Sequence, residues 1–266
     1  MAKYTRILAP NPSLMTGPGT NTIVLDGGKE GAVVIDPADD NPAHLEAIIH
    51  AGNAYGGIRR IFITHGHPDH LGGAEKLRTQ LEAPVYAFSK EGIPFVDQEV
   101  HDDALFTLAD DTLRALYTPG HRFDHLAFLV EGERTLFAGD LISGITTNVI
   151  IPPEGDMFDY LRSLKRLQTI DIAKIIPGHG PEIVDVQGKL TEYMAHRLQR
   201  EQQIVDALYA LPTSTTIPAL VERIYVDVDP RLHPVAAWTV EAHLLKLERE
   251  GRVHHAEKDG WELVKE

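Results

Sequence analysis

The sequence predicts an α/β (α+β) protein in two parts, a larger domain over residues 1–210 and a small one over residues 211–266. Three observations indicate this organisation. Short apolar runs typical of strands alternate with helical patterns through residues 1–180. Four of those runs end in a glycine-containing corner that carries His or Asp. Beyond residue 211 the pattern becomes helix, helix and a short β-ribbon.

Length and composition are those of an ordinary globular protein. The chain has 266 residues, 43% hydrophobic and 24% charged, so it can bury a large core. The formal net charge of -14 repels phosphate backbones, which disfavours nucleic acid as a partner. No segment approaches the roughly 20 apolar residues of a membrane span, so we expect a soluble, cytoplasmic protein without a membrane partner.

The chain has no cysteine, which excludes disulfides and thiolate metal ligands. Any metal would be held by imidazole and carboxylate, a donor set that suits zinc, iron or manganese. The N-terminal segment is rich in proline and lacks the unbroken apolar stretch of a secretion signal.

Through residue 211 the sequence alternates strands and helices. Strands are indicated by short apolar or β-branched runs, and helices by apolar positions three and four apart. Strands are expected over 23–25, 32–35, 58–63, 85–88, 113–117, 126–130, 135–138 and 174–176. Helices are expected from Pro42, over 71–81, after an Asp156 N-cap, and over 187–211, which would link the two domains.

The C-terminal part is predicted to be a winged helix-turn-helix. A loop over 212–216 marks the boundary between the domains. Two helices, a cap at Gly251 and a hairpin around Asp259-Gly260 follow. The expected ranges are 219–225 and 235–250 for the helices and 252–264 for the hairpin.

The stretch Thr64-His65-Gly66-His67-Pro68-Asp69-His70 crowds metal-binding side chains into one strand-to-helix turn. His65 and His67 lie two residues apart, so an extended backbone points them the same way. Asp69 and His70 could turn toward a second position as the helix begins. Because one metal needs three or four protein ligands, this turn supplies enough for one site and a start on another.

Three further strand-like runs end in comparable corners. His121 follows Gly120, Asp140 follows Gly139 and His179 follows Gly178. Strand ends on a rigid sheet are where α/β proteins place their sites. A single histidine on a strand is more often a structural residue, but the joint pattern favours a metal site.

The spacing His-x-His-x-Asp-His, followed by Gly-His, Gly-Asp and Gly-His at strand ends, resembles the metallo-β-lactamase fold superfamily over residues 1–180. The resemblance implies an αββα sandwich of two mixed sheets with metals at one edge. It also implies two divalent metal ions, expected to be zinc. One would be bound by His65, His67 and His121, the other by Asp69, His70 and His179, and Asp140 would bridge them.

Two such ions can share a water and lower its pKa toward 7, which provides a hydroxide nucleophile. By the resemblance, Asp69 would orient that hydroxide as well as bind metal. His67 stands where the di-iron redox branch of the superfamily usually has Glu, which favours hydrolysis over electron transfer. Asp140 stands where many class B β-lactamases have Cys, which argues against antibiotic hydrolysis.

More of the chain looks like the β-lactamase-like protein 2 group, which carries an added C-terminal winged helix. Its animal members include endoribonucleases that act on single-stranded RNA, and its fungal relatives include thioesterases. The matching segments are 11–13 with 18–22, 118–121 with 124–125, 176–181, 196–197 with 200–203, and 235–248.

The charge of the winged helix argues against a role in reading duplex DNA. From residue 211 onward there are ten acidic and seven basic side chains. We therefore expect a packing or pocket-closing module, with Trp238, Leu244 and Leu247 in its core and Trp261 packed beside them. The second helix is expected to expose Glu241, Lys246, Glu248, Arg249 and Glu250.

Two groups of residues are open to interpretation. His125, four residues after His121, could donate a proton to a leaving group, or make a structural hydrogen bond at the start of the next strand. The basic clusters at Arg59-Arg60 and Arg197–Arg200 could be solvated faces or a phosphate track, and the net charge favours solvated faces.

The sequence therefore predicts a metal-dependent hydrolase, with three hypotheses for its role. The first is cleavage of a small-molecule acyl substrate (thioester, ester or lactone). The second is cleavage of single-stranded RNA. The third is a metal-bound scaffold that recruits a partner through the winged helix. The sequence does not give the shape of the loop over 143–154, which would form the pocket wall. It does not give the oligomeric state either.

Overall fold

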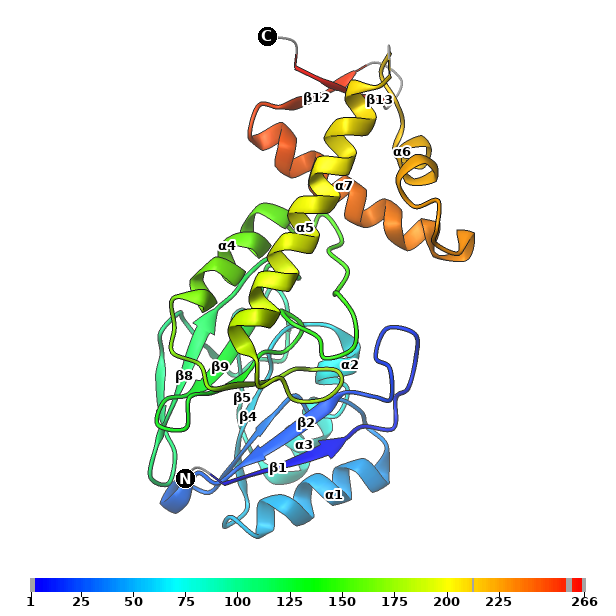
Figure 1. Cartoon of the computed structure of the whole chain (residues 1–266). Coiled ribbons are helices and arrows are strands. Elements are labelled where there is room, and N and C mark those ends of the chain that lie inside the picture. Colours follow the sequence, from blue (N-terminus) through cyan, green and yellow to red (C-terminus); the bar gives the residue numbers. More distant parts are fainter. Residues whose placement is uncertain (1–2, 212, 257–259, 265–266) are drawn as a thin grey trace.

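The structure is a computed structural model that describes residues 3–211, 213–256 and 260–264. Two β-sheets lie face to face with helices on their outer sides, and a smaller helical part follows (Figure 1). The predicted α/β fold and αββα sandwich are thereby confirmed. The predicted loop residue Pro212 and turn residue Asp259 lie outside the described residues.

The first sheet has the strand order β1-β2-β3-β4-β5-β6 and is mixed. Its strands are β1 (Tyr4–Leu8), β2 (Asn21–Leu25), β3 (Ala32–Ile35), β4 (Ile58–Phe62), β5 (Val85–Ala87) and β6 (Gln98–Glu99). β1, β2 and β3 pair antiparallel, and β3 to β6 pair parallel. β2 and β3 form a hairpin with a short 3-10 helix (Gly28–Glu30) in its connection.

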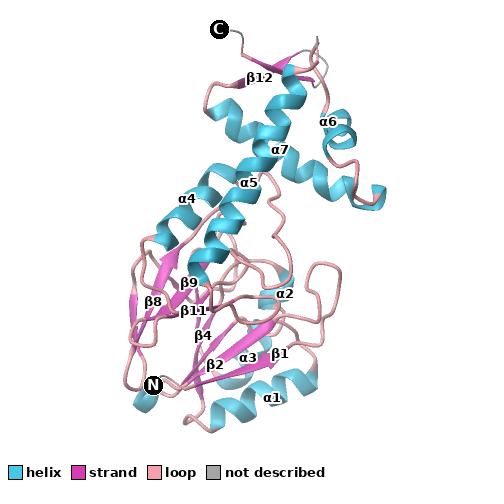
Figure 2. Ribbon diagram, viewed as in Figure 1, coloured by secondary structure: helices cyan, strands magenta, loops and turns pink. Residues whose placement is uncertain are grey.

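The second sheet has the order β11-β10-β9-β8-β7 and is also mixed. Its strands are β7 (Leu105–Thr107), β8 (Thr112–Tyr117), β9 (Leu126–Val130), β10 (Thr135–Phe137) and β11 (Lys174–Ile176). Only β10 and β11 pair parallel. The sheets are visible as the magenta strands of Figure 2.

Helices cover the outer face of each sheet. They are α1 (Pro42–Asn53), α2 (Pro68–Leu71), α3 (Ala74–Leu81), α4 (Met157–Gln168) and α5 (Val186–Tyr209). α1 begins at Pro42 as predicted, and the Asp156 side chain caps α4 by accepting a hydrogen bond from the Asp159 amide at 2.9 Å. Among the described residues, no helix is both long and apolar enough to cross a membrane.

Three apolar layers hold the sandwich together. The central layer lies between the sheets and includes Phe62 and Phe128, whose rings meet edge to face at 5.3 Å. The outer layers lie under α1 and α3 on one side and under α4 and α5 on the other. Because the strands are fixed on both faces, their ends are rigid positions for functional side chains.

The predicted helix over 71–81 is two helices, α2 and α3, separated at Gly72-Gly73. The Gly73 amide donates to Pro37 O at 2.6 Å, so this turn is held against the segment after β3. A Cβ at Gly73 would lie 2.8 Å from that same oxygen, which leaves room only for glycine. The break lets α2 carry Asp69 and His70 toward the sheet ends.

The C-terminal part is a winged helix, as predicted. It contains α6 (Ile217–Ile224), a 3-10 turn (Pro230–Leu232), α7 (His233–Arg249), β12 (Val253–Ala256) and β13 (Gly260–Leu263). Leu244, Leu247 and Trp261 are buried in its core as expected. The end of α5 supplies Ile204 and Leu208 to the same core, so this helix belongs to both parts.

Several side chains on α5 and α7 lie on faces other than those predicted. Trp238 is 41% exposed rather than in the core, whereas Lys246 is buried rather than exposed. The reason is that α7 packs against the sandwich as well as its own domain, with Ala242 inside the outer layer of the sandwich. This second contact turns the buried stripe of α7 away from Trp238.

The prediction of solvated arginines is also wrong in part. Arg197 is 2% exposed and Arg60 is 8% exposed. Arg60 donates to Thr107 O at 2.9 Å and thereby ties β4 to β7 of the other sheet. Leu198 is exposed, because its neighbour Arg197 occupies the buried face of α5.

Glu201 joins α5 to the winged helix. Its buried carboxylate lies 2.8 Å from Lys246 Nζ on α7, 3.1 Å from Arg252 Nη1 and 3.5 Å from His243 Nδ1. Burial opposes ionisation, but the hydrogen bonds from His243 and Lys246 outweigh it and lower the pKa of Glu201 to about 2. This contact therefore stabilises the arrangement of the two parts at neutral pH.

We predict that Glu201→Gln lowers the free energy of unfolding of the C-terminal domain by about 2–3 kcal/mol at pH 7, because Lys246 loses a buried carboxylate partner. Because the folded-state pKa lies below the ordinary value near 4.5, this stabilisation is present above pH 4.5 and is lost as the pH falls toward 2. Urea unfolding between pH 7 and pH 2.5 measures both effects.

Glu192→Gln is the matched control, because Glu192 lies on the same helix in an exposed pair with Lys189. It should change the unfolding free energy by less than about 0.5 kcal/mol. Equal stability of the two variants at pH 7 would contradict the role given to Glu201.

Candidate functional site

The side chains after four strands meet at one edge of the sandwich. β4 leads to the turn that carries His65 and His67, and β8, β10 and β11 lead to His121, Asp140 and His179. The structure brings all seven predicted ligands together in two groups. His65, His67, His121 and Asp140 form the first group, and Asp69, His70 and His179 the second; within each, the ligand atoms lie within 4.8 Å of one another.

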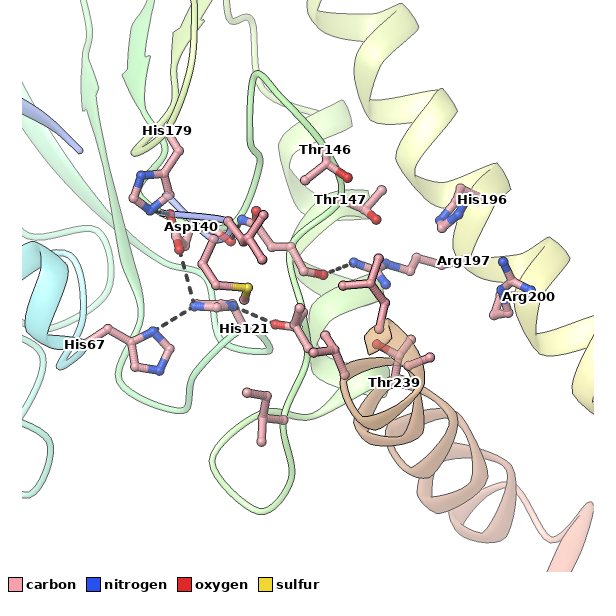
Figure 3. A pocket seen from close by; sticks show the side chains of 18 of the residues that line it. His67, His121, Asp140, Thr146, Thr147, His179, His196, Arg197, Arg200 and Thr239 are labelled. Atoms are coloured by element: carbon pink, nitrogen blue, oxygen red, sulfur yellow. Dashed lines mark hydrogen bonds and ion pairs between the residues drawn. The ribbon is translucent and has the colours of Figure 1, made fainter. Parts of the chain in front are cut away.

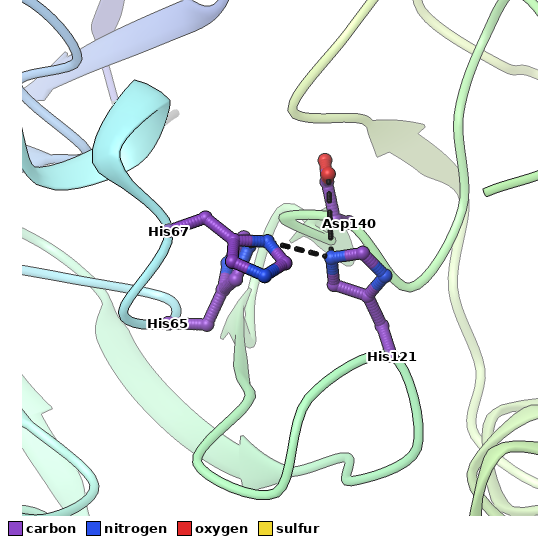
Figure 4. Close-up of side chains that lie close together, drawn as sticks. All are labelled: His65, His67, His121 and Asp140. Atoms are coloured by element: carbon purple, nitrogen blue, oxygen red, sulfur yellow. Dashed lines mark hydrogen bonds and ion pairs between the residues drawn. The ribbon is translucent and has the colours of Figure 1, made fainter. Parts of the chain in front are cut away.

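The first group presents imidazole nitrogens to a common point (Figure 4). His67 Nδ1 lies 2.9 Å from His65 Nε2 and 3.0 Å from His121 Nε2. The far nitrogens are engaged elsewhere: His65 Nδ1 contacts Thr64 Oγ1 at 3.0 Å, and His121 Nδ1 donates to Val149 O at 3.0 Å.

These outer contacts fix which nitrogen carries the proton. With Nδ1–H used as a donor, neutral His65 and His121 both present bare Nε2 lone pairs to His67. His67 Nδ1 can donate one proton to only one of them. At least one of the two Nε2 lone pairs is therefore left without a proton, an arrangement that a bound cation satisfies.

The second group pairs imidazoles with carboxylates. His179 Nε2 lies 3.3 Å from Asp69 Oδ2 and 3.4 Å from His70 Nε2. His70 and His179 are buried, whereas the Asp69 side chain keeps 31% of its surface exposed. Two imidazoles and one carboxylate are a ligand set that suits zinc, iron or manganese.

The Asp140 carboxylate lies between the two groups. Its Oδ2 is 3.6 Å from His121 Nε2 in the first group, and its Oδ1 is 3.3 Å from His179 Nε2 and 3.4 Å from His70 Nε2 in the second. Oδ1 is buried and has no hydrogen-bond partner among the described residues. A Cβ at Gly178 would lie 2.7 Å from this oxygen, so glycine is required for the approach.

Asp36, which directly follows β3, orients both groups. Its carboxylate accepts hydrogen bonds at 2.7 Å from the Thr64 amide, Thr64 Oγ1 and His70 Nδ1. Because Thr64 Oγ1 donates to Asp36, it is left to accept from His65 Nδ1. One carboxylate thus sets the tautomers of His65 and His70, one histidine from each group.

Electrostatics differ between the groups. Burial and the neighbouring imidazoles hold the pKa of His65 well below 6.5, and they lower the pKa of His67 to about 4. Both rings are therefore neutral at pH 7, the form that binds metal. In the second group burial opposes protonation of His179, but Asp140 raises its pKa to about 9. The carboxylates there make the second group attractive to cations.

His125 uses both ring nitrogens for structure. Nδ1 contacts Thr118 Oγ1 at 2.9 Å, and Nε2 accepts from the Asp140 amide at 3.1 Å. The ring is fully buried, and burial holds its pKa well below the ordinary value. These contacts favour the structural hydrogen bond of the two roles considered for His125. The same contacts argue against the proton-donor role, which stays an untested prediction.

The loop over 143–154 is anchored to α5. The Tyr193 hydroxyl accepts from the Ser143 amide at 2.9 Å and donates to Thr146 O at 2.6 Å. Asn148 Nδ2 donates to Asp140 O, and Arg197 Nη2 donates to Asn148 O. The linker helix therefore fixes the backbone beside the metal-site residues, a role that helical periodicity alone did not indicate.

A cavity of about 580 Å³ opens from the two groups toward the winged helix. Figure 3 shows His67, His121, Asp140 and His179 at one side, with His196, Arg197 and Arg200 of α5 opposite them. Apolar side chains complete the wall: Val149 and Ile151 from the loop, Leu14 and Met15 from the N-terminal segment, and Val228 and Val235 from the winged helix. A cavity of this size accommodates a small-molecule substrate.

A family model described as the metallo-beta-lactamase superfamily matches residues 15–179, which include all seven residues of the two groups. The chain belongs to the metallo-beta-lactamase superfamily. A second model, the beta-lactamase associated winged helix domain, matches residues 216–261. The chain is thus a metallo-hydrolase of this superfamily, built on a fold with a His/Asp metal-binding cluster.

Several proteins are similar to most of this chain. A Drosophila melanogaster protein named beta-lactamase-like protein 2 homolog is 35% identical over 93% of this chain and 88% of its own length. An Aspergillus chevalieri protein named atrochrysone carboxyl ACP thioesterase is 33% identical over 77% of this chain and 66% of its own length. A solved metallo-beta-lactamase family protein from Thermus thermophilus shares the fold, with a TM-score of 0.81 at 22% identity and 98% coverage of both chains.

We predict that Asp36→Asn lowers metal affinity by about 10- to 100-fold, chiefly at the group that contains His70. The amide can no longer accept all three hydrogen bonds, so His70 loses the partner that keeps its proton on Nδ1. Titration against a competing chelator, with metal content measured by mass spectrometry, gives the affinities.

Asp40→Asn is the control, because Asp40 is an exposed carboxylate four residues along the same segment. Its metal affinity should equal that of the wild type. Unchanged affinity in Asp36→Asn would show that the Asp36 contacts do not position the ligands.

Proposed function

We propose that the protein hydrolyses a small acyl substrate, a thioester, ester or lactone, with two divalent metal ions, expected to be zinc. The observation that carries this proposal is the cavity, which begins at the two groups of ligands and continues between apolar side chains. An acyl chain fits such a wall, and the carbonyl would lie at the metal end. The thioesterase name of one relative supports the same class of bond.

The residues present fit a pair of metals. His65, His67 and His121 would hold one, Asp69, His70 and His179 the other, and each Asp140 oxygen already faces a different group. Divalent metals bound there supply a nucleophile from water at neutral pH and polarise the attacked carbonyl. With no cysteine in the chain, no thiol could take the nucleophile's place.

Asp69 is the protein group best placed to handle a proton. Its carboxylate lines the cavity and stays partly exposed, unlike the other members of the second group. Burial opposes its ionisation, but the hydrogen bond from His179 outweighs it and lowers the pKa of Asp69, so it is ionised at neutral pH. An ionised oxygen in this position can orient the attacking water and accept its proton.

We propose that the winged helix forms the far wall of this cavity. The domain boundary between residues 1–210 and residues 211–266 is also a proposal. Tyr225 and Val228 after α6 and Val235, Ala236 and Thr239 on α7 line the space in front of the metal-site residues. A module used in this way shapes the substrate pocket and needs no nucleic acid. A cytoplasmic location also stays a prediction.

Cleavage of single-stranded RNA is the second candidate, because Arg197 and Arg200 line the cavity and could contact a phosphate. The apolar wall and the net charge of -14 favour the acyl substrate. The scaffold hypothesis would gain support from a metal site that is intact but closed to solvent. It loses support because five of the seven ligand residues line the cavity, namely His67, Asp69, His121, Asp140 and His179.

We predict that the zinc-loaded protein hydrolyses acyl-thioesters or lactones faster than nitrocefin or a single-stranded RNA. His67→Ala and Asp140→Ala should each lower kcat/KM by more than about 100-fold, since both remove a ligand on which charge stabilisation depends. Chelation should abolish turnover and added zinc should restore it. All four substrates are assayed in parallel.

His101→Ala provides the control, because His101 is exposed and outside the two groups. It should retain wild-type turnover. Full activity of His67→Ala or Asp140→Ala would sink the metal-dependent mechanism, and cleavage of RNA alone would replace the acyl substrate with the second candidate.

A further inference from the structure

Arg197 is a buried cation with little to balance it. The side chain is 2% exposed, and its Nε has no hydrogen-bond partner among the described residues. Nη2 donates to Asn148 O, and the guanidinium lies over the Tyr160 ring, 5.2 Å from its centroid. In the part of the chain that the structure describes, no carboxylate lies within ion-pair distance of it. A buried charge without a counter-charge is costly unless an anion neutralises it.

The nearest acidic neighbour on α5 is engaged elsewhere. Glu201, one helical turn further on, points to Lys246 and Arg252 and holds the winged helix. Arg197 instead lines the cavity that begins at the metal-site residues. The buried polar face of α5 thus carries two groups with different roles. Glu201 holds the winged helix, and Arg197 lines the pocket.

Arg200 on α5 enlarges this positive region, and His196 adds a neutral ring, because burial and the two arginines lower its pKa from the ordinary 6.5. His196 and Arg200 line the same cavity, as Figure 3 shows. The Arg200 guanidinium lies over the Tyr225 ring at 4.0 Å, so the first residues after α6 hold it in place. Arginine in such a fixed position binds carboxylate or phosphate through paired hydrogen bonds.

We propose that Arg197, with Arg200 and His196 beside it, forms an anion subsite that holds a carboxylate or phosphate group of the substrate remote from the bond that is hydrolysed. This rests on the proposed function and narrows it to anionic acyl esters and thioesters. The anionic group lies against α5, the apolar part lies along the winged helix, and the acyl carbonyl reaches the metal end. The guanidinium takes no part in the chemical step and is a positioning residue.

The test compares three thioesters that share one acyl chain length. The first is a neutral acyl N-acetylcysteamine thioester, the second carries a terminal carboxylate on the acyl chain, and the third is a 4′-phosphopantetheine thioester. The zinc-loaded wild type should prefer at least one anionic substrate over the neutral one. Which of the two it prefers tells whether the anion belongs to the acyl or to the thiol side.

Arg197→Gln should lower the ratio of kcat/KM for the preferred anionic substrate over the neutral one by roughly 10- to 100-fold, mainly through KM. Arg197→Lys should recover part of that ratio, because it restores the charge without the planar fork. Arg200→Gln should shift the ratio in the same direction by less. This variant keeps the test valid if the Arg197 variants misfold, because Arg200 is only half-buried and its substitution disturbs the fold less.

The matched control is Arg162→Gln, an arginine on α4 that is 70% exposed and outside this cavity. Its substrate ratio should equal that of the wild type. An equal fall for neutral and anionic substrates in both Arg197→Gln and Arg200→Gln would overturn the subsite, because these residues would then only support the pocket wall.

A binding measurement separates this inference from the proposed function. Calorimetry uses a thioether analogue of the carboxylate substrate and one of the phosphopantetheine substrate, each with a methylene in place of the carbonyl. If neither these thioesters nor an ester or lactone is hydrolysed, the proposed function fails, yet Arg197-dependent binding of either analogue would still support the anion subsite. Arg197-dependent binding of a single-stranded RNA, with no binding of either analogue, would overturn the assignment to acyl substrates.

Discussion

The constraint on which the structure depends is that several imidazole lone pairs must point at two fixed places with no proton between them. The Asp36 carboxylate meets much of this demand, because its hydrogen bonds to Thr64 and His70 decide which ring nitrogen carries a proton. Four strand ends supply the ligands, and the sandwich keeps these ends rigid. The fold therefore provides pre-organisation, so little rearrangement is needed when a cation binds.

The helix α5 connects this centre to the C-terminal part. Near its beginning Tyr193 holds the loop over 143–154, at its middle Arg197 faces the cavity, and one turn later Glu201 binds the winged helix. A single helix thus fixes the pocket wall, the charge inside the pocket and the position of its far side. On our proposal, the acidic winged helix serves the hydrolase as the far wall of the pocket and needs no nucleic acid for that role.

The sequence predicted the two-layered fold, and it singled out the seven candidate ligands that the structure brings together, because local patterns indicate both. These patterns are short apolar runs and the His or Asp side chains in the corners that follow them. The sequence did not indicate the role of Asp36, because an aspartate at a strand end is also an ordinary turn residue. Its role depends on the approach of Thr64 and His70 in the folded protein. Arg197 and Lys246 were assigned to solvent because charged residues on a helix usually face it. Their burial depends on contacts between the two parts, as does the exposure of Trp238, and helical periodicity within one segment does not contain that information.

The account stands or falls on two metal ions sharing Asp140. A crystal structure of the zinc-reconstituted protein, with data collected on both sides of the zinc absorption edge, tests this most directly. Two anomalous peaks are expected, one among His65, His67 and His121 and one among Asp69, His70 and His179, with an Asp140 oxygen beside each. A single peak, or histidines that hydrogen-bond to one another and to water with no peak between them, would contradict it.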